Sequence, residues 1–179
     1  MLNWVWYWSV TSDELTNIMT DIDGHVHRKF MPIGKIRPEI WDIQLKNARS
    51  IMPPPILDLI KKTTKPFLAL VNEHLSTQAT FFDGKMVLVG DALSLFRPHV
   101  ALSANQAALH CLNLKKVMEG KMSMRRWEGE ALRYAKATGL SSVAAGHFGL
   151  SKYGQLFFDV VRYLVCIIGQ KLSSFWHSD

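Results

Sequence analysis

Two polar residues with clear chemical potential lie between an apolar run at 86–89 and a helical pattern that begins near Ser103. Asp91 follows soon after the apolar run, and His99 lies in the loop that leads to the helix. Ligands of open α/β folds settle at the ends of strands, where the N–H groups of a following helix favour electron-rich atoms. A carboxylate and an imidazole at that place suit acid–base chemistry, so Asp91 and His99 are the candidate catalytic residues.

Each of these side chains also has a structural interpretation. Asp91 is equally suited to capping neighbouring backbone amides, and His99 is as well suited to a structural role as to a chemical one. Arg97 is able to bind an anionic group or to pair with a surface carboxylate. His110 lies on a small-residue helix and is expected to be a core histidine, whereas His147, in a glycine-flanked segment expected to be a loop, is a weaker site candidate.

Metal chemistry is not expected from this sequence. His25 and His27 share one face of a predicted strand, but no third ligand has matching placement. Cys111 and Cys166 lack the spacing of metal-binding or disulfide motifs and are expected to be buried free thiols. These thiols, together with a start that lacks the features of a signal peptide, predict a cytoplasmic protein.

Composition favours a folded domain that binds small molecules. The 179 residues are 48% hydrophobic with a formal net charge of +6, but the basic residues are scattered and carry no nucleic-acid-binding motif. Nucleic acid is therefore not an expected partner. The apolar run 156–168 is interrupted by Asp159 and Arg162, which excludes an integral membrane span. It predicts an amphipathic helix, for which packing on the protein is preferred over peripheral membrane contact.

The pattern of the whole chain predicts an α+β fold with a mixed β-sheet lobe and a strand-plus-helices lobe. Residues 1–84 are expected to form the first lobe, and residues 85–179 are expected to form the second, which includes the C-terminal helices. Trp4, Trp6 and Trp8 alternate along the first predicted strand and share one of its faces. Strands or extended segments are expected at 3–10, 25–31, 66–71, 77–82 and 86–89, and helices at 12–19, 37–52, 56–62, 103–118, 124–138 and 153–172.

The segment 84–114, GKMVLVGDALSLFRPHVALSANQAALHCLNL, carries a family resemblance. It resembles the C-terminal FAD motif of class A flavin hydroxylases of the p-hydroxybenzoate hydroxylase type, and in particular the 2,6-dihydroxypyridine hydroxylase-like subgroup. The resemblance covers nearly the whole chain and implies the truncated C-terminal half of such an enzyme. It implies that Asp91 contacts the ribityl chain of FAD, that Pro98 and His99 flank the isoalloxazine, and that the backbone of 101–105 faces its pyrimidine edge.

The resemblance also implies that residues 1–84 form a substrate-type sheet lobe with helices, and that residues 85–179 are the remnant of an FAD-binding lobe with the C-terminal helices. Trp4, Trp6 and Tyr7 would line the sheet that holds an aromatic substrate, although aromatic residues in a strand are more often core. Three residues of the second lobe are expected to complete that site: Phe96, Arg97 and Pro98.

Departures from the family pattern concern the cofactor. The sequence contains no GxGxxG, so the FAD pyrophosphate has no visible binding turn. Leu93-Ser94 replaces the usual small residues after GDA, and 101–104 replaces a glycine-rich turn. The added Cβ atoms lie where the backbone would approach a flavin closely.

Three functions remain open. The preferred hypothesis is a cofactor-independent cyclase or isomerase of a natural-product pathway, acting on a small hydrophobic or aromatic substrate as a homodimer. The second is half of a split FAD-dependent monooxygenase, with the cofactor contacted by Asp91, Pro98, Ala101 and Asn105. The third is a ligand-binding relic without chemistry.

Overall fold

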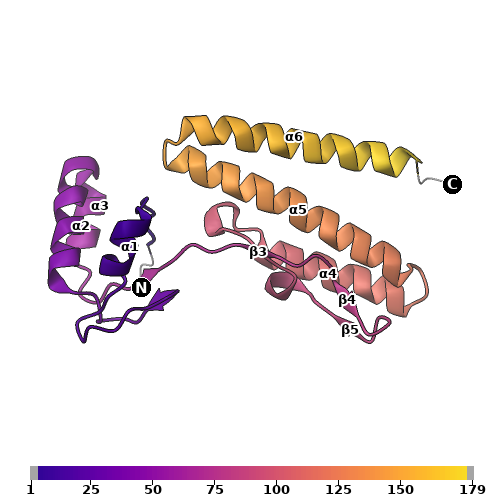
Figure 1. Cartoon of the computed structure of the whole chain (residues 1–179), viewed down its shortest axis with the longest axis horizontal. Helices are drawn as coiled ribbons and strands as arrows, with labels where there is room; N and C mark the ends of the chain where they lie inside the picture. The colour runs from indigo at the N-terminus through magenta and orange to yellow at the C-terminus, as the bar shows by residue number, and fades with distance from the viewer. Residues whose placement is uncertain (1–3, 177–179) are drawn as a thin grey trace. The chain divides into compact units, whose positions relative to one another are not determined.

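The chain divides into two compact units, Met1–Leu70 and Val71–Asp179. The computed structural model describes the backbone of residues 4–176 and the side chains as far as Leu172 (Figure 1). Each unit contains its own cluster of buried hydrophobic residues. The two expected lobes, 1–84 and 85–179, differ in the ligand that each would contact. This division therefore remains a prediction.

The first helix of unit 1, α1 (Ser12–Ile18), begins at a capping box. The Thr11 hydroxyl accepts a hydrogen bond from the Glu14 backbone N–H at 3.4 Å, and the Glu14 carboxylate accepts one from the Thr11 N–H at 3.1 Å. Two amide groups that lack a partner within the helix are thereby satisfied. This arrangement explains why the helix begins where the Ser/Thr-rich segment predicts it.

Prolines set the boundaries of the two following helices, α2 (Pro38–Ile51) and α3 (Pro54–Lys61). Each helix has proline within its first turn, where the missing N–H costs no helical hydrogen bond. The core of unit 1 contains Met19, Met31 and Leu68. The last two residues belong to β1 (Phe30–Met31) and β2 (Leu68–Ala69), which pair antiparallel.

A buried carboxylate organises the loop after α1. Asp21 accepts hydrogen bonds from the backbone N–H groups of Asp23 and His25, both at 2.9 Å, and lies 2.8 Å from His27 Nε2. The bond to the His27 side chain lowers the Asp21 pKa to about 2, with help from the two backbone bonds and against the opposing effect of burial. The ionised carboxylate is therefore the form that the folded loop prefers.

We expect Asp21→Asn to destabilise unit 1 and to flatten the acid side of its stability profile. The folded pKa of Asp21 lies below the ordinary value of 3.8, so its stabilising contribution is present above that value and is lost as pH falls toward about 2. Denaturant unfolding from pH 7 to pH 2 would measure this. Asp13→Asn, on the exposed surface of α1, is the control; equal pH profiles for both variants would contradict the prediction.

Unit 2 begins with short antiparallel strand pairs. β3 (His74–Leu75) pairs with β6 (Ser94–Leu95), and β4 (Thr80–Phe81) pairs with β5 (Met86–Val87). The turn between β4 and β5 contains Asp83 and Gly84, both with positive φ, as the Asp-Gly pair predicts. Two single-turn helices follow, η1 (Gly90–Ala92) and η2 (Pro98–Val100).

Three long helices complete unit 2: α4 (Ser103–Met118), α5 (Met124–Gly149) and α6 (Tyr153–Trp176). Figure 1 shows α5 and α6 running antiparallel along much of their length, and α5 also packs on α4. The core between these helices and the strands contains Ala79, Leu93, Trp127 and Ala131. None of the helices in the described residues is both long enough and apolar enough to cross a membrane.

The α+β class is confirmed, but three local predictions are wrong. Residues 4–10 form no regular secondary structure, and position 3 lies outside the described residues. A strand needs a second strand as its hydrogen-bonding partner. In this segment Trp8 instead packs on the core of unit 1, and the Trp4 indole donates to Thr63 Oγ1 at 3.0 Å. The described strands form separate two-stranded antiparallel sheets rather than a mixed sheet. Met86 is 44% exposed, so β5 is not covered on both faces.

Candidate functional site

The expected strand-end motif is present as the turn η1, which packs on α4. Gly90 has φ +56°, and a Cβ there would lie 3.2 Å from the Ala107 Cβ. Glycine therefore permits both the left-handed backbone and the close approach of η1 to the helix. Asp91 is exposed on this turn. Asp91 therefore lies between the strand β5 and the helix α4, as the sequence predicts. Its catalytic role remains a prediction.

The amino end of α4, at Ser103, follows η1 and η2 in the chain. Ala101 has φ +52° and ψ +33°, a left-handed conformation at a non-glycine residue. Leu102 occupies the N-cap and provides no side-chain hydrogen bond, so the first N–H groups of α4 lack the usual capping oxygen. Such an end favours an electron-rich or anionic group.

Two buried polar residues one turn apart hold α4 against the motif. Gln106 Nε2 donates to the Ser94 carbonyl at 2.9 Å, and the Gly90 N–H donates to His110 Nδ1 at 3.1 Å. Burial lowers the His110 pKa and thus favours its neutral form. The expectation of a core histidine is confirmed, because His110 is 1% exposed.

The structure brings His99 close to His147, which lies inside α5 instead of in the expected loop. A Cβ added at Gly146 would lie 2.6 Å from His99 Cδ2 and 2.7 Å from its Nε2, so the imidazole occupies the space that glycine leaves. His147 Nδ1 lies 2.5 Å from Asp159 Oδ2, on the facing helix α6. Asp159 is buried and also lies 3.9 Å from Arg162 Nη1.

This cluster has the parts of an acid–base site. A carboxylate that holds one imidazole nitrogen fixes the tautomer and directs the other nitrogen elsewhere, as in catalytic carboxylate–histidine pairs. The pKa of His99 is lowered by burial and, to a smaller extent, by the positive charges of Arg97 and His147. His99 is therefore neutral at pH 7 and able to accept a proton.

We expect Gly146→Ala to disturb His99, whereas Gly139→Ala on the same helix should not. No atom lies within 4 Å of the Cβ position at Gly139, so alanine there should add about 0.5–1 kcal/mol of stability through backbone entropy. At Gly146 the contact with His99 should cancel that gain and shift the imidazole. Denaturant unfolding and the His99 NMR signals measure both effects; equal stabilisation by the two alanines would contradict the prediction.

Arg97, a residue of the predicted substrate site, has structural partners. Arg97 Nε donates to Glu73 Oε2 at 2.9 Å and Arg97 Nη2 to Glu73 Oε1 at 3.2 Å, which matches the surface-pairing interpretation. The Ser142 hydroxyl donates to the Arg97 carbonyl at 2.6 Å and so ties this segment to α5. Phe96 is buried, and Pro98 is exposed at the start of η2. Their substrate contacts remain predictions.

The aromatic residues near the amino end belong to unit 1. Trp4, Trp6 and Tyr7 are partly buried, and the ring centroids of Trp6 and Trp8 lie 5.9 Å apart. These residues and the η1–η2 segment lie in different units, so a cavity between them remains a proposal.

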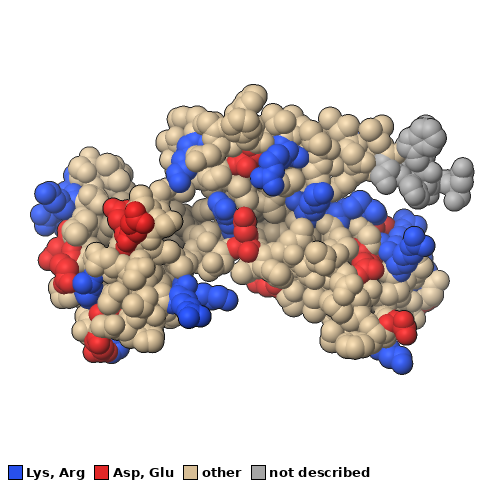
Figure 2. Space-filling model, viewed as in Figure 1, with Lys and Arg blue, Asp and Glu red and all other residues tan. Residues whose placement is uncertain are grey.

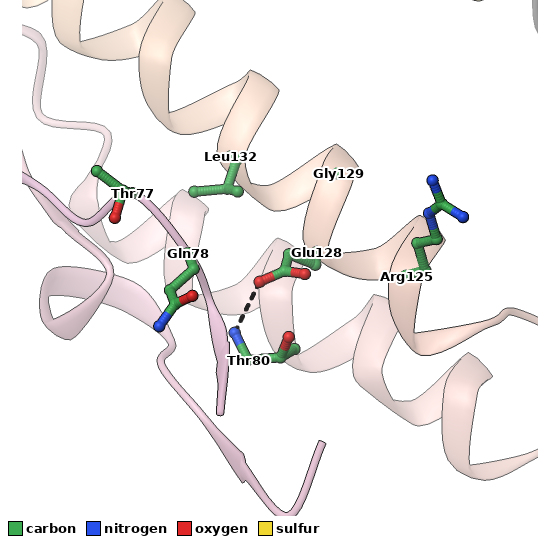
Figure 3. Close-up of a pocket in the computed structure, with 7 residues that line it drawn as sticks. All are labelled: Thr77, Gln78, Thr80, Arg125, Glu128, Gly129 and Leu132. Carbon is green, nitrogen blue, oxygen red and sulfur yellow. Dashed lines mark hydrogen bonds between the residues drawn. The ribbon is translucent and has the colours of Figure 1, made fainter. Parts of the chain in front are cut away.

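A separate pocket in unit 2 has a volume of about 350 Å³. Its carboxylate, Glu128, accepts hydrogen bonds from the backbone N–H groups of Ala79 and Thr80 at 2.7 and 2.8 Å. Burial opposes ionisation of Glu128, but these bonds hold its pKa below the ordinary value. The carboxylate thus has a structural task. Figure 3 shows the lining residues Thr77, Gln78, Thr80, Arg125, Glu128, Gly129 and Leu132.

Metal-binding clusters of three or more His, Cys, Asp or Glu residues are absent from the described part of the chain. His27 instead contacts Asp21, and the His25 and His27 rings meet edge to face at 4.7 Å. Cys166 is partly buried, but Cys111 is exposed, so the prediction that both thiols are buried is wrong for Cys111.

Comparison with known proteins points to flavin hydroxylases. A family model described as FAD binding domain-like matches residues 1–73. The chain is 27% identical over 146 residues to 2,6-dihydroxypyridine 3-monooxygenase of Paenarthrobacter nicotinovorans, covering 76% of this chain and 35% of that protein. It thus spans about a third of the length of this relative.

A solved structure gives the same relation at the level of fold. 2,6-Dihydroxypyridine-3-hydroxylase from Arthrobacter nicotinovorans matches with a TM-score of 0.68 and 24% sequence identity, over 79% of this chain and 37% of that one. At this identity the match shows the fold alone. The family match, the sequence relation and the fold together confirm the resemblance read from segment 84–114.

Proposed function

From this homology to part of a flavin-dependent aromatic hydroxylase, we propose that the chain supplies the flavin-facing and substrate-facing elements of an FAD-dependent monooxygenase. The observation that carries the proposal is the uncapped amino end of α4, in the same segment as the exposed Asp91 of η1. An acceptor-rich ring edge fits those N–H groups, and a sugar-like hydroxyl chain fits the carboxylate.

Asp91 and the uncapped amino end of α4 fit the flavin end of FAD, whereas the Cβ atoms of 101–104 oppose a close approach of the ring. Asp91 would hold the ribityl hydroxyls, and the backbone of Ala101 and Asn105 would face the pyrimidine edge, with Pro98 beside the ring system. When bound, the flavin supplies activation of dioxygen for hydroxylation of an aromatic ring. The adenine and pyrophosphate end has no GxGxxG turn in these 179 residues, so its binding requires a dinucleotide-binding portion from elsewhere.

An aromatic substrate suits the remaining residues. Trp6 and Tyr7 offer flat apolar surface, and Arg97 and Pro98 offer a polar, rigid edge beside His99. Trp4 and Phe96 offer further apolar surface for an aromatic ring. We propose that the substrate is a small hydrophobic or aromatic ring, with Trp4, Trp6 and Tyr7 as its candidate contacts in unit 1 and Phe96, Arg97 and Pro98 as those in unit 2.

Riboflavin titration tests the flavin proposal, because riboflavin carries the ring and the ribityl chain without the dinucleotide. We expect saturable fluorescence quenching by the full chain, weakened about tenfold by Asp91→Asn through loss of a charge-assisted hydrogen bond. Asp83→Asn is the control, since Asp83 is exposed in the left-handed β4–β5 turn, where asparagine is tolerated. Absence of saturable quenching, or equal effects of the two variants, would overturn the proposal.

A second candidate is a cofactor-independent cyclase or isomerase of a natural-product pathway. The observation that favours it is the His147–Asp159 pair beside His99, since such reactions need orientation and one or two acid or base groups. The departures of the sequence from the flavin-binding pattern favour this function, whereas the relation to a monooxygenase favours the flavin-dependent one. A ligand-binding relic remains the third candidate if both activities are absent.

A homodimer in the cytoplasm remains part of the proposal. The helix α4 offers an apolar face for self-association, because Leu112 and Met118 are exposed on it together with Cys111. Light scattering of the full chain measures the oligomeric state.

A further inference from the structure

The helix α6 has two different faces. The face toward α5 contains its less exposed residues, which recur every three or four positions: Leu156, Asp159, Tyr163, Cys166 and Gln170. The opposite side, here called the outer face, consists of apolar residues that are between 42% and 67% exposed. These residues are Phe157, Phe158, Val161, Leu164, Val165, Ile168 and Leu172.

Such a surface calls for a covering partner. Soluble monomers rarely leave a continuous apolar stripe over several helical turns in water, because transfer of that area to an apolar environment is favourable. Figure 2 shows the upper edge of the molecule, over α6, as almost entirely uncharged, with Lys and Arg side chains along the border between α6 and α5.

Charge identifies the kind of partner. A helical period of 3.6 residues places Arg162 and Lys171, both exposed, at opposite borders of the outer face. On α5, Arg133 is exposed and its carbonyl accepts from Gln170 Nε2 at 3.1 Å, so a further cation lies beside α6. Asp159 is the only acidic residue among the described side chains of α6. It is 5% exposed and contacts His147.

This pattern disfavours a second copy of the chain and favours an anionic lipid surface. Two outer faces brought together would bring the like-charged cations at their borders near one another, which opposes association of two copies through this face. A bilayer with acidic headgroups offers apolar depth to the stripe and negative charge to both borders.

We propose that the outer face of α6 docks the protein on an anionic membrane surface, with the helix lying in the plane of the interface. The phenylalanine, leucine and isoleucine side chains enter the boundary between headgroups and acyl chains, and Arg162 and Lys171 reach the headgroups from either side. The helix lies on the bilayer instead of crossing it, in agreement with its hydropathy. This inference does not depend on the proposed catalytic function.

Co-sedimentation of the full chain with vesicles tests the proposal. We expect strong binding to phosphatidylcholine vesicles that contain phosphatidylserine, weak binding to phosphatidylcholine alone, and loss of binding as salt is raised. Ile168→Asp should lower the affinity by about tenfold or more. The matched control is Ile43→Asp on α2, because the two isoleucines are 57% and 53% exposed, and it should bind like the unchanged chain.

A second variant tests the charge contribution without altering the apolar stripe. Arg162→Gln with Lys171→Gln should weaken binding to the anionic vesicles by about fivefold per cation and leave binding to phosphatidylcholine unchanged. Equal affinity for both vesicle types, or no effect of the double variant, would overturn the proposal. So would absence of vesicle binding together with a dimer that Ile168→Asp converts to a monomer in light scattering, since a second copy would then cover the outer face.

Discussion

Trp127→Ala is expected to destabilise unit 2 by about 3–5 kcal/mol, the largest stability effect expected from these predictions. Trp127 is 1% exposed and packs among Ala79, Leu93 and Ala131, and the two alanines have too little side chain to refill the space. Its Nε1 also donates to the His110 carbonyl at 3.0 Å. The alanine variant therefore combines a cavity with the loss of a buried hydrogen bond.

Denaturant unfolding of the full chain measures this effect in the transition of unit 2. Phe148→Ala is the control on the same helix, because Phe148 is 65% exposed, and it should change stability by about 0.5 kcal/mol or less. Trp127→Phe keeps much of the volume and loses the N–H donor, so its cost should lie between the other two. A loss from Trp127→Ala no larger than that from Phe148→Ala would show that this core is not the source of stability.

His99→Ala is expected to lower turnover by about 10²-fold if the cluster with His147 and Asp159 performs acid–base chemistry. The pKa of His99 lies below its ordinary value of 6.5, because burial, Arg97 and His147 all disfavour the imidazolium. A neutral imidazole acts as the base, so kcat/KM should be level near pH 7 and fall as pH drops through that lowered pKa, below 6.5.

Steady-state kinetics against pH distinguishes catalysis by His99 from structural support. His147→Gln should lower kcat as well, and Asp159→Asn should act through the tautomer of His147. His74→Ala is the control, since His74 is an exposed histidine of β3. Unchanged turnover in both His99→Ala and Asp91→Asn would remove the two predicted catalytic residues from the mechanism.

Helices with local start and stop signals could be predicted from the sequence. The prolines that open α2 and α3, and the glycine after α4, determine boundaries through the chain's own backbone, so the predicted ranges 37–52 and 103–118 agree closely with the observed helices. The strand predicted at 3–10 failed because a strand depends on a distant partner. Its aromatic residues pack on unit 1 without a hydrogen-bonded neighbour strand.

The pairing of His147 with Asp159 escaped prediction because glycines concealed the length of α5. Gly139, Gly146 and Gly149 predicted an end near 138, but packing against α6 keeps the helix intact to Gly149. A signal was available in Asp159 itself: an acidic residue within an apolar helical run requires a buried partner, and a histidine on the preceding helix is a suitable one.

The antiparallel α5–α6 pair has a consequence for the order in which unit 2 folds. Its first contacts join neighbours in the chain around the reversal at 150–152, so little loop entropy opposes their formation, and the remaining contacts extend the pair from there. The hydrogen bonds from Ala79 and Thr80 to Glu128 instead span 49 and 48 positions. We therefore expect the helical pair, with His147 and Asp159, to form early, and the segment that carries Asp91 in η1 and His99 in η2 to be added to it late. The candidate site is then completed in the last steps of folding, on a scaffold that already exists.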